Sequence, residues 1–426
     1  MGIGATIAAR ATPPGAGGVA IIRVSGPDAF AIAEALTRKA PTVGAIQFAR
    51  FHDRAGRLLD EGLVLAFAGP HSYTGEDVIE FQGHGGEVAP RRILEACFAA
   101  GARSADRGEF TRRAFLNGKL TYEQAEGVLA LIEAQTERAA DAALAGLRGR
   151  HRELLTTLYH RALDLSARVA YVLDVEEGEI PAALPGELAA QAAALANEIT
   201  AEVRRLREGI LLRRGIRVAL AGAPNAGKSS LLNALLKMNR AIVSAIPGTT
   251  RDTIEESCSI GGWPVHLIDT AGLRTTDDPI EAEGVKRTSQ ALDEADFVID
   301  FDSSLPTTDP RRIAVHAKCD LGRGEGLNFS SKTGEGLDAL RDELARRIAE
   351  RAEKNLESPS GQEDEMSALL GAIAALRRGA EKSTESELTL LAYELRTGCE
   401  CLGRPLGVTY TADMLDRLFN RFCVGK

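Results

Sequence analysis

The sequence of 426 residues lacks any run of about 18 or more apolar residues, and no N-terminal segment has the charged-then-apolar pattern of a secretion signal. Its six cysteines are far apart except for Cys399 and Cys401, whose spacing fits neither a zinc knuckle nor a redox pair. Basic charge is not in excess, since the net charge is -9. We therefore expect a cytoplasmic protein with reduced thiols and no membrane span, which does not coat nucleic acid through phosphate contacts.

The first half of the chain changes in composition near residue 119. Residues 1–118 are rich in Gly and Pro and alternate short β-like runs with helical stretches near 28–38 and 89–100, which predicts an α+β domain. Residues 119–214 are rich in Ala, Leu and Glu and predict long paired helices. These helices follow a capping box in "TYEQ" and are interrupted by "DVEEGEIPAALPG".

The second half changes in the same way. Residues 215–351 repeat strand-turn-helix units, and residues 352–426 return to amphipathic helix after a linker predicted at 357–365. An α/β unit between two helical stretches indicates an insertion into one helical domain. The predicted fold class is therefore multidomain α/β, with an N-terminal α+β domain, a helical domain and an inserted α/β domain.

The stretch "RVALAGAPNAGKSSLLNALL" has the pattern of a strand, a loop and a helix. Its loop has the form G-x-x-x-x-G-K-S from Gly222 to Ser229, in the context that a P-loop requires. In such a loop the backbone N–H groups bind phosphate oxygens, Lys228 reaches the terminal phosphates and the Ser229 hydroxyl ligates Mg²⁺. The residues expected to contact a nucleotide here are Asn225, Ala226, Gly227, Lys228, Ser229 and Ser230.

Two downstream motifs complete a nucleotide site. "PVHLIDTAG" places Asp269 at the end of an apolar strand, where a Walker-B aspartate meets Mg²⁺ through water and a following glycine senses the γ-phosphate. "SAIPGTTRD" supplies Thr249 and Thr250 in a loop typical of switch I, and Thr250 is the expected second Mg²⁺ ligand. The expected contacts of the first motif are Asp269, Thr270, Ala271 and Gly272.

The base-recognition loop departs from the usual guanine motif Asn-Lys-x-Asp, because "AKCD" has Ala317 in place of Asn. Asp320 can still accept both guanine N–H donors, and Lys318 can pack over the base. "FSSKTGEGL" is similar to the last guanine loop, with Ser331 and Lys332 expected to line the ring. We therefore expect GTP and GDP as ligands.

The motif "DTAGLR" leaves the catalytic water without its usual partner. Ras-like proteins place a water-orienting Gln directly after this glycine, and Leu273 cannot take that role. No arginine finger is visible in the sequence either. Another residue must therefore orient the water.

Taken together, these stretches resemble the MnmE (TrmE) family of tRNA modification GTPases over nearly the whole chain. The matching blocks are "ATPPGAGGVAIIRVSGP", "SYTGEDVIEFQGHGG", "GEFTRRAFLNGKL", "PNAGKSSLLNALL", "AIPGTTRDTI", "DTAGLR" and "FCVGK". The resemblance implies an N-terminal folate-binding and dimerisation domain at 1–118, a helical domain in two parts at 119–214 and 352–426, and a Ras-like G domain inserted at 215–351.

The resemblance also implies how GTP is hydrolysed. Members of the family use potassium and G-domain dimerisation in place of an arginine finger, and a fixed monovalent cation offsets transition-state charge as a guanidinium would. Glu281 matches the water-activating glutamate of the family. The positions that correspond to the potassium ligands are Asn225, Ser244, Ile246 and Thr249, and Ser244 is also expected beside the nucleotide.

A folate site is implied in the N-terminal domain. The residues at the positions where the family contacts a formyl-tetrahydrofolate are Arg23, Glu80, Lys119 and Lys426. An acidic residue can recognise the amino and amide edge of a pterin, and cations suit carboxylates. We expect the tail to enter this pocket, so that Cys423 lies beside the one-carbon unit, where it attacks covalently or only shapes the site.

The implied partners are a tRNA and an FAD-containing MnmG protein, in an expected heterotetramer with a homodimer of this chain. Together they modify C5 of the wobble uridine with a methylene-tetrahydrofolate carbon. The flavin is expected on the partner, because no G-x-G-x-x-G fingerprint with a following acid is present.

Two rival interpretations remain at this stage. An Era-like ribosome-assembly GTPase would need a KH-type G-x-x-G segment after residue 351, where the sequence predicts helix. A lipid-anchored GTPase is suggested by "MGIGAT" and the terminal Cys-Val-Gly-Lys, but Gly425 and Lys426 are atypical for a prenylation box.

Overall fold

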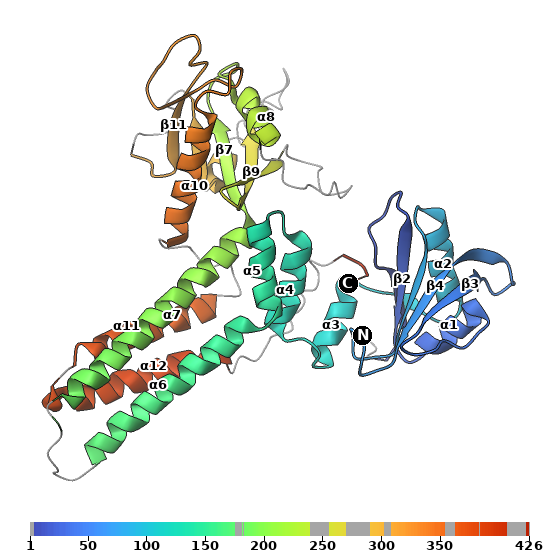
Figure 1. Cartoon of the computed structure of the whole chain (residues 1–426), viewed down its shortest axis with the longest axis horizontal. Coiled ribbons are helices and arrows are strands. Elements are labelled where there is room, and N and C mark those ends of the chain that lie inside the picture. Colours follow the sequence, from blue (N-terminus) through green and yellow to red (C-terminus); the bar gives the residue numbers. More distant parts are fainter. Residues whose placement is uncertain are drawn as a thin grey trace. The chain divides into compact units, whose positions relative to one another are not determined.

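The computed structural model describes residues 4–174, 181, 183–238, 255–269, 290–301, 308–353, 363–382, 384–406 and 423–425 (Figure 1). The chain divides into two compact units, one of residues 1–129, 146–149 and 409–426 and the other of residues 130–145 and 150–408. No helix within these described ranges is long and apolar enough to cross a membrane.

The first unit contains a six-stranded sheet with the strand order β3-β4-β5-β2-β1-β6. All neighbouring strands are antiparallel except β1 and β6, which are parallel. The strands are β1 Ile7–Arg10, β2 Val19–Ser25, β3 Ile46–His52, β4 Leu58–Phe67, β5 Val78–His84 and β6 Arg103–Ser104. Helices α1 (Ala29–Thr37) and α2 (Val88–Ala99) lie where the sequence predicts helix.

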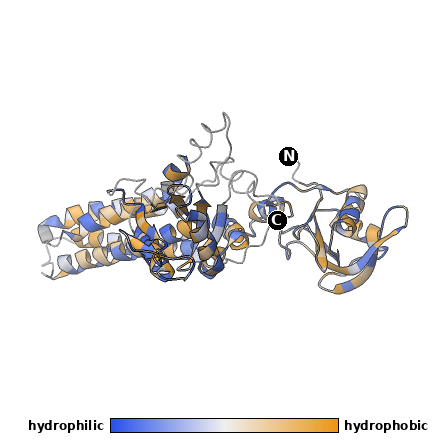
Figure 2. Cartoon of the chain, turned by 90° about the horizontal axis from the view of Figure 1, so that it is seen from above, coloured by the Kyte–Doolittle hydropathy of each residue, from blue (hydrophilic) through white to orange (hydrophobic). Residues whose placement is uncertain are grey.

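One face of this sheet forms the core of the unit. Ile22 and Phe81 are register partners on β2 and β5, and both are buried in a cluster with the apolar sides of α1 and α2. Because side chains alternate along a strand, the adjacent partners Arg23 and Glu80 face the other side of the sheet. Figure 2 shows hydrophobic and hydrophilic residues interspersed along these strands.

The predicted capping box is confirmed at the start of α4 (Tyr122–Glu133). The Gln124 side chain accepts a hydrogen bond from the Thr121 backbone N–H at 2.9 Å, and the Thr121 hydroxyl accepts one from the Gln124 N–H at 3.2 Å. Two N–H groups that lack partners within the helix are thereby satisfied. The shorter helix α3 (Glu109–Leu116) lies between β6 and α4 in the chain.

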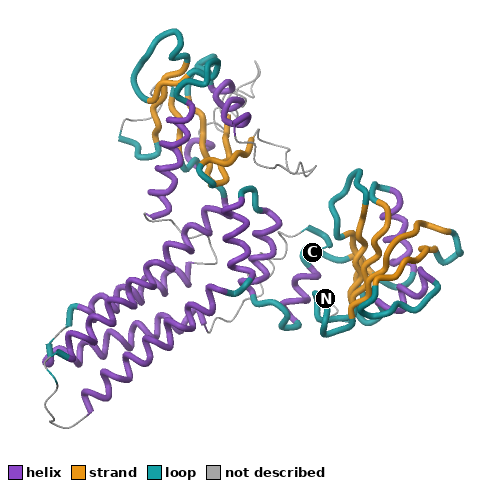
Figure 3. Tube along the Cα trace, in the orientation of Figure 1, coloured by secondary structure: helices purple, strands orange, loops and turns teal. Residues whose placement is uncertain are grey.

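A helical bundle forms much of the second unit. Its helices are α6 Arg150–Asp174, α7 Leu184–Arg214, α11 Glu363–Ala380 and α12 Leu388–Leu406, with a short 3-10 turn at Glu385–Glu387. They lie side by side and share one apolar cluster (Figure 3). Leu158, Leu165 and Val169 are buried in it, as their helical spacing predicts. The bundle joins helices from both sides of the α/β segment, so the predicted insertion is confirmed.

The predicted linker at 357–365 is wrong at its C-terminal end. Helix α11 begins at Glu363, so the last three residues of the predicted linker are helical.

The inserted domain is a second six-stranded sheet with the order β12-β11-β10-β7-β9-β8. Only the β8–β9 pair is antiparallel. The strands are β7 Ile216–Ala221, β8 Glu255–Ile260, β9 Trp263–Asp269, β10 Phe297–Asp300, β11 Arg312–Ala317 and β12 Leu327–Phe329. Helices α8 (Lys228–Met238) and α10 (Leu337–Glu353) contribute Leu231, Leu235, Leu340 and Leu344 to its core.

One buried carboxylate connects the two ends of the inserted domain. Asp296 is 3% exposed and pairs with Arg214 at 2.6 Å, where α7 leads into the domain, and with Arg351 at 3.0 Å, near the end of α10. Its second oxygen accepts the Arg217 backbone N–H at 3.0 Å. The two chain segments that enter and leave the domain are thus tied to the same residue.

A second ionic junction lies inside the helical bundle. His151 of α6 contacts Glu202 of α7 through Nδ1 at 2.7 Å and Glu365 of α11 through Nε2 at 2.6 Å. Burial by itself would lower the pKa of this imidazole, but the two carboxylates outweigh burial and raise the pKa to about 9. The imidazolium therefore bridges the helices on either side of the insertion.

We predict that this junction makes bundle stability depend on pH. The pKa of His151 is raised from 6.5 to about 9 on folding, so its contribution is fully present below pH 6.5 and is lost as the pH rises through 9. His151→Gln should cost on the order of 2 kcal/mol at low pH and much less above pH 9. Urea unfolding monitored by circular dichroism measures this difference, with exposed His160→Gln on the same helix as control. A difference that does not change with pH contradicts the prediction.

Candidate nucleotide and tail sites

The P-loop lies between β7 and α8, as predicted. Strand β7 is buried at the centre of the sheet, and Leu231, Leu232 and Leu235 hold α8 against it at helical spacing. The loop requires left-handed backbone at Gly227 (φ 106°) and, unusually for a residue with a side chain, at Asn225 (φ 64°). The loop therefore ends at the N-terminus of α8, where backbone N–H groups favour phosphate.

The polar side chains of the P-loop are held in place by the loop itself. Lys228 is 4% exposed, and its ammonium donates to the carbonyl oxygens of Gly222 at 2.6 Å and Ala223 at 2.7 Å. The Ser229 hydroxyl donates to Asp269 Oδ2 at 2.7 Å. A hydroxyl and a carboxylate in contact form an oxygen donor set that fits Mg²⁺. The structure thus brings together the P-loop and Walker-B residues that the sequence predicts.

The residues predicted to recognise the base lie beside the P-loop. Lys318 has a left-handed backbone (φ 60°) and its Nζ donates to the Asn225 carbonyl oxygen at 3.5 Å. Ala317 lies close to Gly227 of the loop, since a Cβ added to Gly227 would lie 3.4 Å from the Ala317 Cβ. An Ala side chain reaches the loop here but offers no hydrogen bond to a base.

Asp320 is held ionised by the second guanine loop. A hydrogen bond from the Ser330 side chain, and to a smaller extent the charge of Lys332, lower the pKa of Asp320 below its usual value. The sequence analysis chose Ser331 and Lys332 in this loop and missed Ser330, which is 1% exposed. The twin serines of "FSSK" were the available signal, because the first of them directly follows the buried strand residue Phe329.

The G domain has unusually short connections between parallel strands. Residues 301–311 join β10 to β11, and residues 318–326 join β11 to β12, whereas parallel strands usually need a crossover of a dozen or more residues. The described residues 308–311 and 318–326 contain no helix. The described parts of both connections are therefore loops and turns.

Two arginines hold the first of these connections. Arg311 donates to the carbonyl oxygens of Leu292 at 3.0 Å and Ala295 at 3.4 Å and pairs with Asp309 at 3.0 Å. Arg312 pairs with the buried Asp300 across the β10–β11 ladder at 2.7 Å. Charge-assisted hydrogen bonds thus fix the described C-terminal end of this connection.

The N-terminal unit places two of the predicted folate residues in contact. Arg23 and Glu80 pair at 2.9 Å across β2 and β5. The Arg23 guanidinium lies 5.5 Å from the Tyr73 ring centroid and 5.6 Å from that of Phe110. Sequence reasoning missed both rings, although each lies in a motif block that it quoted. Lys119 is exposed, and its stem lies near Gly75, in the loop that carries Tyr73.

An ionic network supports this region. Burial would raise the pKa of Glu109, but Arg103, the Asp106 N–H and Arg113 lower that pKa to about 2. Arg113 also pairs with Glu76 at 2.9 Å. None of these residues was predicted from the sequence, since each alone has the pattern of a surface charge.

The end of the chain lies against the N-terminal unit. Val424 forms an antiparallel bridge with Arg107, and the Gly108 N–H donates to the Cys423 carbonyl oxygen at 3.4 Å. Gly425 (φ 104°) is so close to the backbone of Arg10 that a Cβ would overlap the Arg10 carbonyl. Only glycine fits this position, and the Cys423 side chain remains exposed.

Several predicted site residues lie outside the described residues. They are Ser244, Ile246, Thr249, Thr250, Thr270, Ala271, Gly272, Glu281 and Lys426. Their roles remain predictions.

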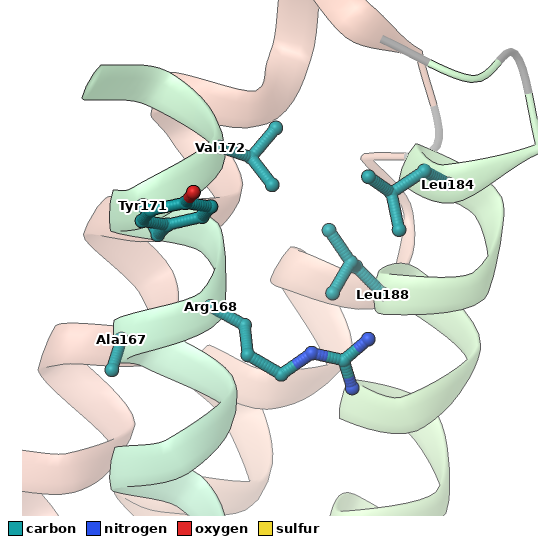
Figure 4. Close-up of a pocket in the computed structure, with 6 residues that line it drawn as sticks. All are labelled: Ala167, Arg168, Tyr171, Val172, Leu184 and Leu188. Atoms are coloured by element: carbon teal, nitrogen blue, oxygen red, sulfur yellow. The ribbon is translucent and has the colours of Figure 1, made fainter. Parts of the chain in front are cut away.

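The helical bundle also has a cavity of about 360 Å³ (Figure 4). It is lined by Ala167, Arg168, Tyr171, Val172, Leu184 and Leu188. Arg168 donates to Gln191 at 2.9 Å, and the rest of the lining is mostly apolar. The cavity contains none of the predicted site residues.

The fold and the first site define a multidomain P-loop protein of the nucleotide-binding class. Residues 6–119 match the family described as "GTP-binding protein TrmE N-terminus", and residues 123–423 match "MnmE helical domain". The chain is 42% identical to the tRNA modification GTPase MnmE of Symbiobacterium thermophilum, with 99% of each chain covered, and 42% identical to that of Alkalilimnicola ehrlichii, again with 99% of each. The chain therefore belongs to the MnmE family of tRNA modification GTPases, which decides against the Era-like alternative.

Two solved structures can be superposed on part of this chain. The G domain of the T. maritima FeoB iron transporter is 27% identical with a TM-score of 0.23, over 31% of this chain and 98% of that one. A GTP-binding protein of Sulfolobus solfataricus in complex with GDP is 13% identical with a TM-score of 0.24, over 46% and 67%. These overlaps are too low to bear on function.

We predict that Ala317→Asn tightens the binding of guanine nucleotides. The Ala317 side chain lies beside the P-loop but cannot hydrogen-bond a base. A restored hydrogen bond should improve affinity about two- to tenfold. Calorimetric titration of both forms with GDP measures this gain. Asp320→Asn is the comparison variant, because it should lose guanine selectivity both in the wild type and together with Ala317→Asn. An unchanged GDP affinity of Ala317→Asn contradicts the prediction.

Proposed function

We propose that this protein hydrolyses GTP in the cytoplasm and, with an FAD-containing MnmG partner, adds an aminomethyl-type or carboxymethylaminomethyl group at C5 of the wobble uridine of certain tRNAs. The carbon comes from a tetrahydrofolate derivative. The observation that carries the proposal is that one chain combines a P-loop site with a terminal Cys423–Gly425 segment seated on the N-terminal unit. Nucleoside analysis of tRNA from cells that lack the protein tests this proposal. Intact wobble modification in those cells would contradict it.

The nucleotide site supports binding of GTP with Mg²⁺. The chain supplies backbone N–H groups and Lys228 for the phosphates, and Ser229 would hold the metal together with Thr250, with Asp269 close by. Bound Mg²⁺ neutralises charge that develops on the phosphate oxygens. Without the metal, the Ser229–Asp269 hydrogen bond keeps both side-chain oxygens beside the proposed Mg²⁺ position.

The hydrolysis step is proposed to need potassium. Asn225 lies in the described P-loop, and Ser244, Ile246 and Thr249 would complete a site for K⁺ beside it. Because Leu273 cannot orient water, Glu281 is proposed to orient and activate the attacking water. G-domain dimerisation would bring this machinery into its active form.

We predict that GTP hydrolysis is faster in KCl than in NaCl at equal ionic strength, because K⁺ would offset transition-state charge in the absence of an arginine finger. Steady-state phosphate release measures the two rates. Glu281→Ala should lower kcat far more than nucleotide affinity. Equal rates in the two salts would contradict the proposed role of potassium. An unchanged kcat in Glu281→Ala would contradict the proposed role of Glu281 in activating water.

A tetrahydrofolate site is proposed around Arg23 and Glu80. The side chains of this pair are 16% and 15% exposed, so they remain accessible on the sheet face opposite to the core. Glu80 could accept the amino and amide donors of a pterin, while Arg23, Lys119 and Lys426 suit ligand carboxylates. Exposed Cys423 on the seated tail is the proposed catalytic residue next to the one-carbon unit.

We predict that Cys423→Ser abolishes tRNA modification while GTP hydrolysis stays near the wild-type rate, because the P-loop and the tail belong to different units. The readouts are wobble-nucleoside content and phosphate release on the same preparation. Arg23→Ala is the comparison variant, and it should lose binding of 5-formyltetrahydrofolate, which Cys423→Ser should retain. Full modification by Cys423→Ser would reduce the thiol to a packing role, and loss of both activities would indicate misfolding.

The partners are proposed to be tRNA, MnmG and a second copy of this chain. An exposed apolar patch on the open face of the N-terminal sheet supports the homodimer: Ile46 and Phe48 of β3 are 70% and 67% exposed, and Leu63 of β4, the register partner of Phe48, is 38% exposed. Exposed patches of this kind mark interaction sites. Sedimentation equilibrium of the full chain would give a monomer mass if no homodimer forms.

A further inference from the structure

An arginine on α5 connects the helices of the second unit to the sheet of the G domain. The Arg138 guanidinium of α5 (Glu137–Leu147) lies 4.0 Å from the ring centroid of Trp263, and it pairs with Glu208 of α7 at 3.4 Å. Trp263 is 2% exposed and is the only tryptophan in the sequence. The contact therefore connects two helices to the first residue of β9.

Small residues let α5 approach the sheet closely. Ala139 is 6% exposed and belongs to the core of the G domain, and Ala142 packs against the same core. On the strand side, a Cβ added to Gly262 (φ 80°) would lie 3.6 Å from Arg138 Cδ. The glycine turn before Trp263 thus holds the indole against the arginine stem, and α5 is packed on the domain rather than merely adjacent in sequence.

Strand β9 leads from this contact to the nucleotide site. It begins at Trp263 and ends at Asp269, which accepts the Ser229 hydroxyl in the P-loop. Its neighbour β7 leads into the P-loop, and Leu220 of β7 is in register with Asp269. Strand β9 is paired with β7 on one side and β8 on the other, so a shift of Asp269 would be transmitted along the strand to Trp263.

We propose that Arg138 is a positioning residue that couples the nucleotide site to α5 and α7 through β9, and that the contact between its guanidinium and the Trp263 indole changes with the bound nucleotide. The proposal rests on nucleotide binding at the P-loop and goes beyond it by naming the path to the helical part of the chain. Neither side chain is among the residues proposed to bind or hydrolyse the nucleotide.

If Arg138 had only a structural role, its substitution would lower the stability of the protein but would leave the response of the Trp263 emission to nucleotide unchanged. The indole is the only one in the chain, so tryptophan emission reports on this contact alone. The full-length protein is titrated with GDP and then with a non-hydrolysable GTP analogue, both with Mg²⁺ and K⁺. We expect the two complexes to differ in emission in the wild type.

Arg138→Gln tests the path. This variant should lose most of the emission difference, keep its basal GTP hydrolysis, and modify tRNA about two- to fivefold more slowly with the partner protein present, the range that corresponds to loss of a partly exposed cation–π contact. Arg138→Lys should restore the difference, because an ammonium also stacks on indole. Arg161→Gln is the matched control, since it breaks the exposed α6–α7 pair with Glu198 and leaves Trp263 untouched.

The outcomes separate this inference from the function on which it rests. Nucleotide binding is measured independently by calorimetry, and absence of binding in the wild type would contradict the proposed GTP site. With binding intact, the inference is overturned if the wild type shows no emission difference between GDP and the GTP analogue, or if Arg138→Gln keeps the whole of that difference.

Discussion

The insertion of the G domain imposes one constraint on which the rest of the second unit depends: the chain must leave the helical bundle and return to it at nearly the same place. Asp296 meets that constraint with a buried carboxylate shared by Arg214 and Arg351, at the two ends of the insertion. Removing either arginine would leave part of a buried charge without its partner, which is more costly than losing an exposed ion pair. Inside the bundle, the imidazolium of His151 likewise connects the two sides of the insertion, because it contacts Glu202 of α7 and Glu365 of α11.

The register of β7 and β9 then determines where the chemistry lies. Because Leu220 is opposite Asp269, the end of β9 meets the start of the P-loop, and the Ser229 hydroxyl reaches the carboxylate. A shift of one residue would turn the Asp269 side chain to the other face of the sheet. The same strand carries Trp263 at its other end, so its buried apolar run holds both Asp269, beside the proposed Mg²⁺ site, and the contact with α5 in place.

Much of this organisation could be predicted from local pattern. The capping box of α4, the P-loop and the buried faces of the bundle helices depend on spacing within a few residues, and the sequence displays that spacing directly. The Arg23 environment could not be found in this way, because Tyr73 and Phe110 reach it from distant segments and only the fold brings them together. Ser330 was missed for a different reason: two serines stand side by side, and only burial distinguishes the one that bonds Asp320.

Two arginines hold the described C-terminal end of the connection between β10 and β11. Arg311 donates to the Leu292 and Ala295 carbonyl oxygens, which lie just before β10, and Arg312 pairs with the buried Asp300. These bonds lie within a few residues of the two strands, and Lys318, the residue after β11, lies beside the P-loop. The "AKCD" stretch begins at Ala317, the last residue of β11, so the position of the residues predicted to read guanine depends on the strand that these arginines hold.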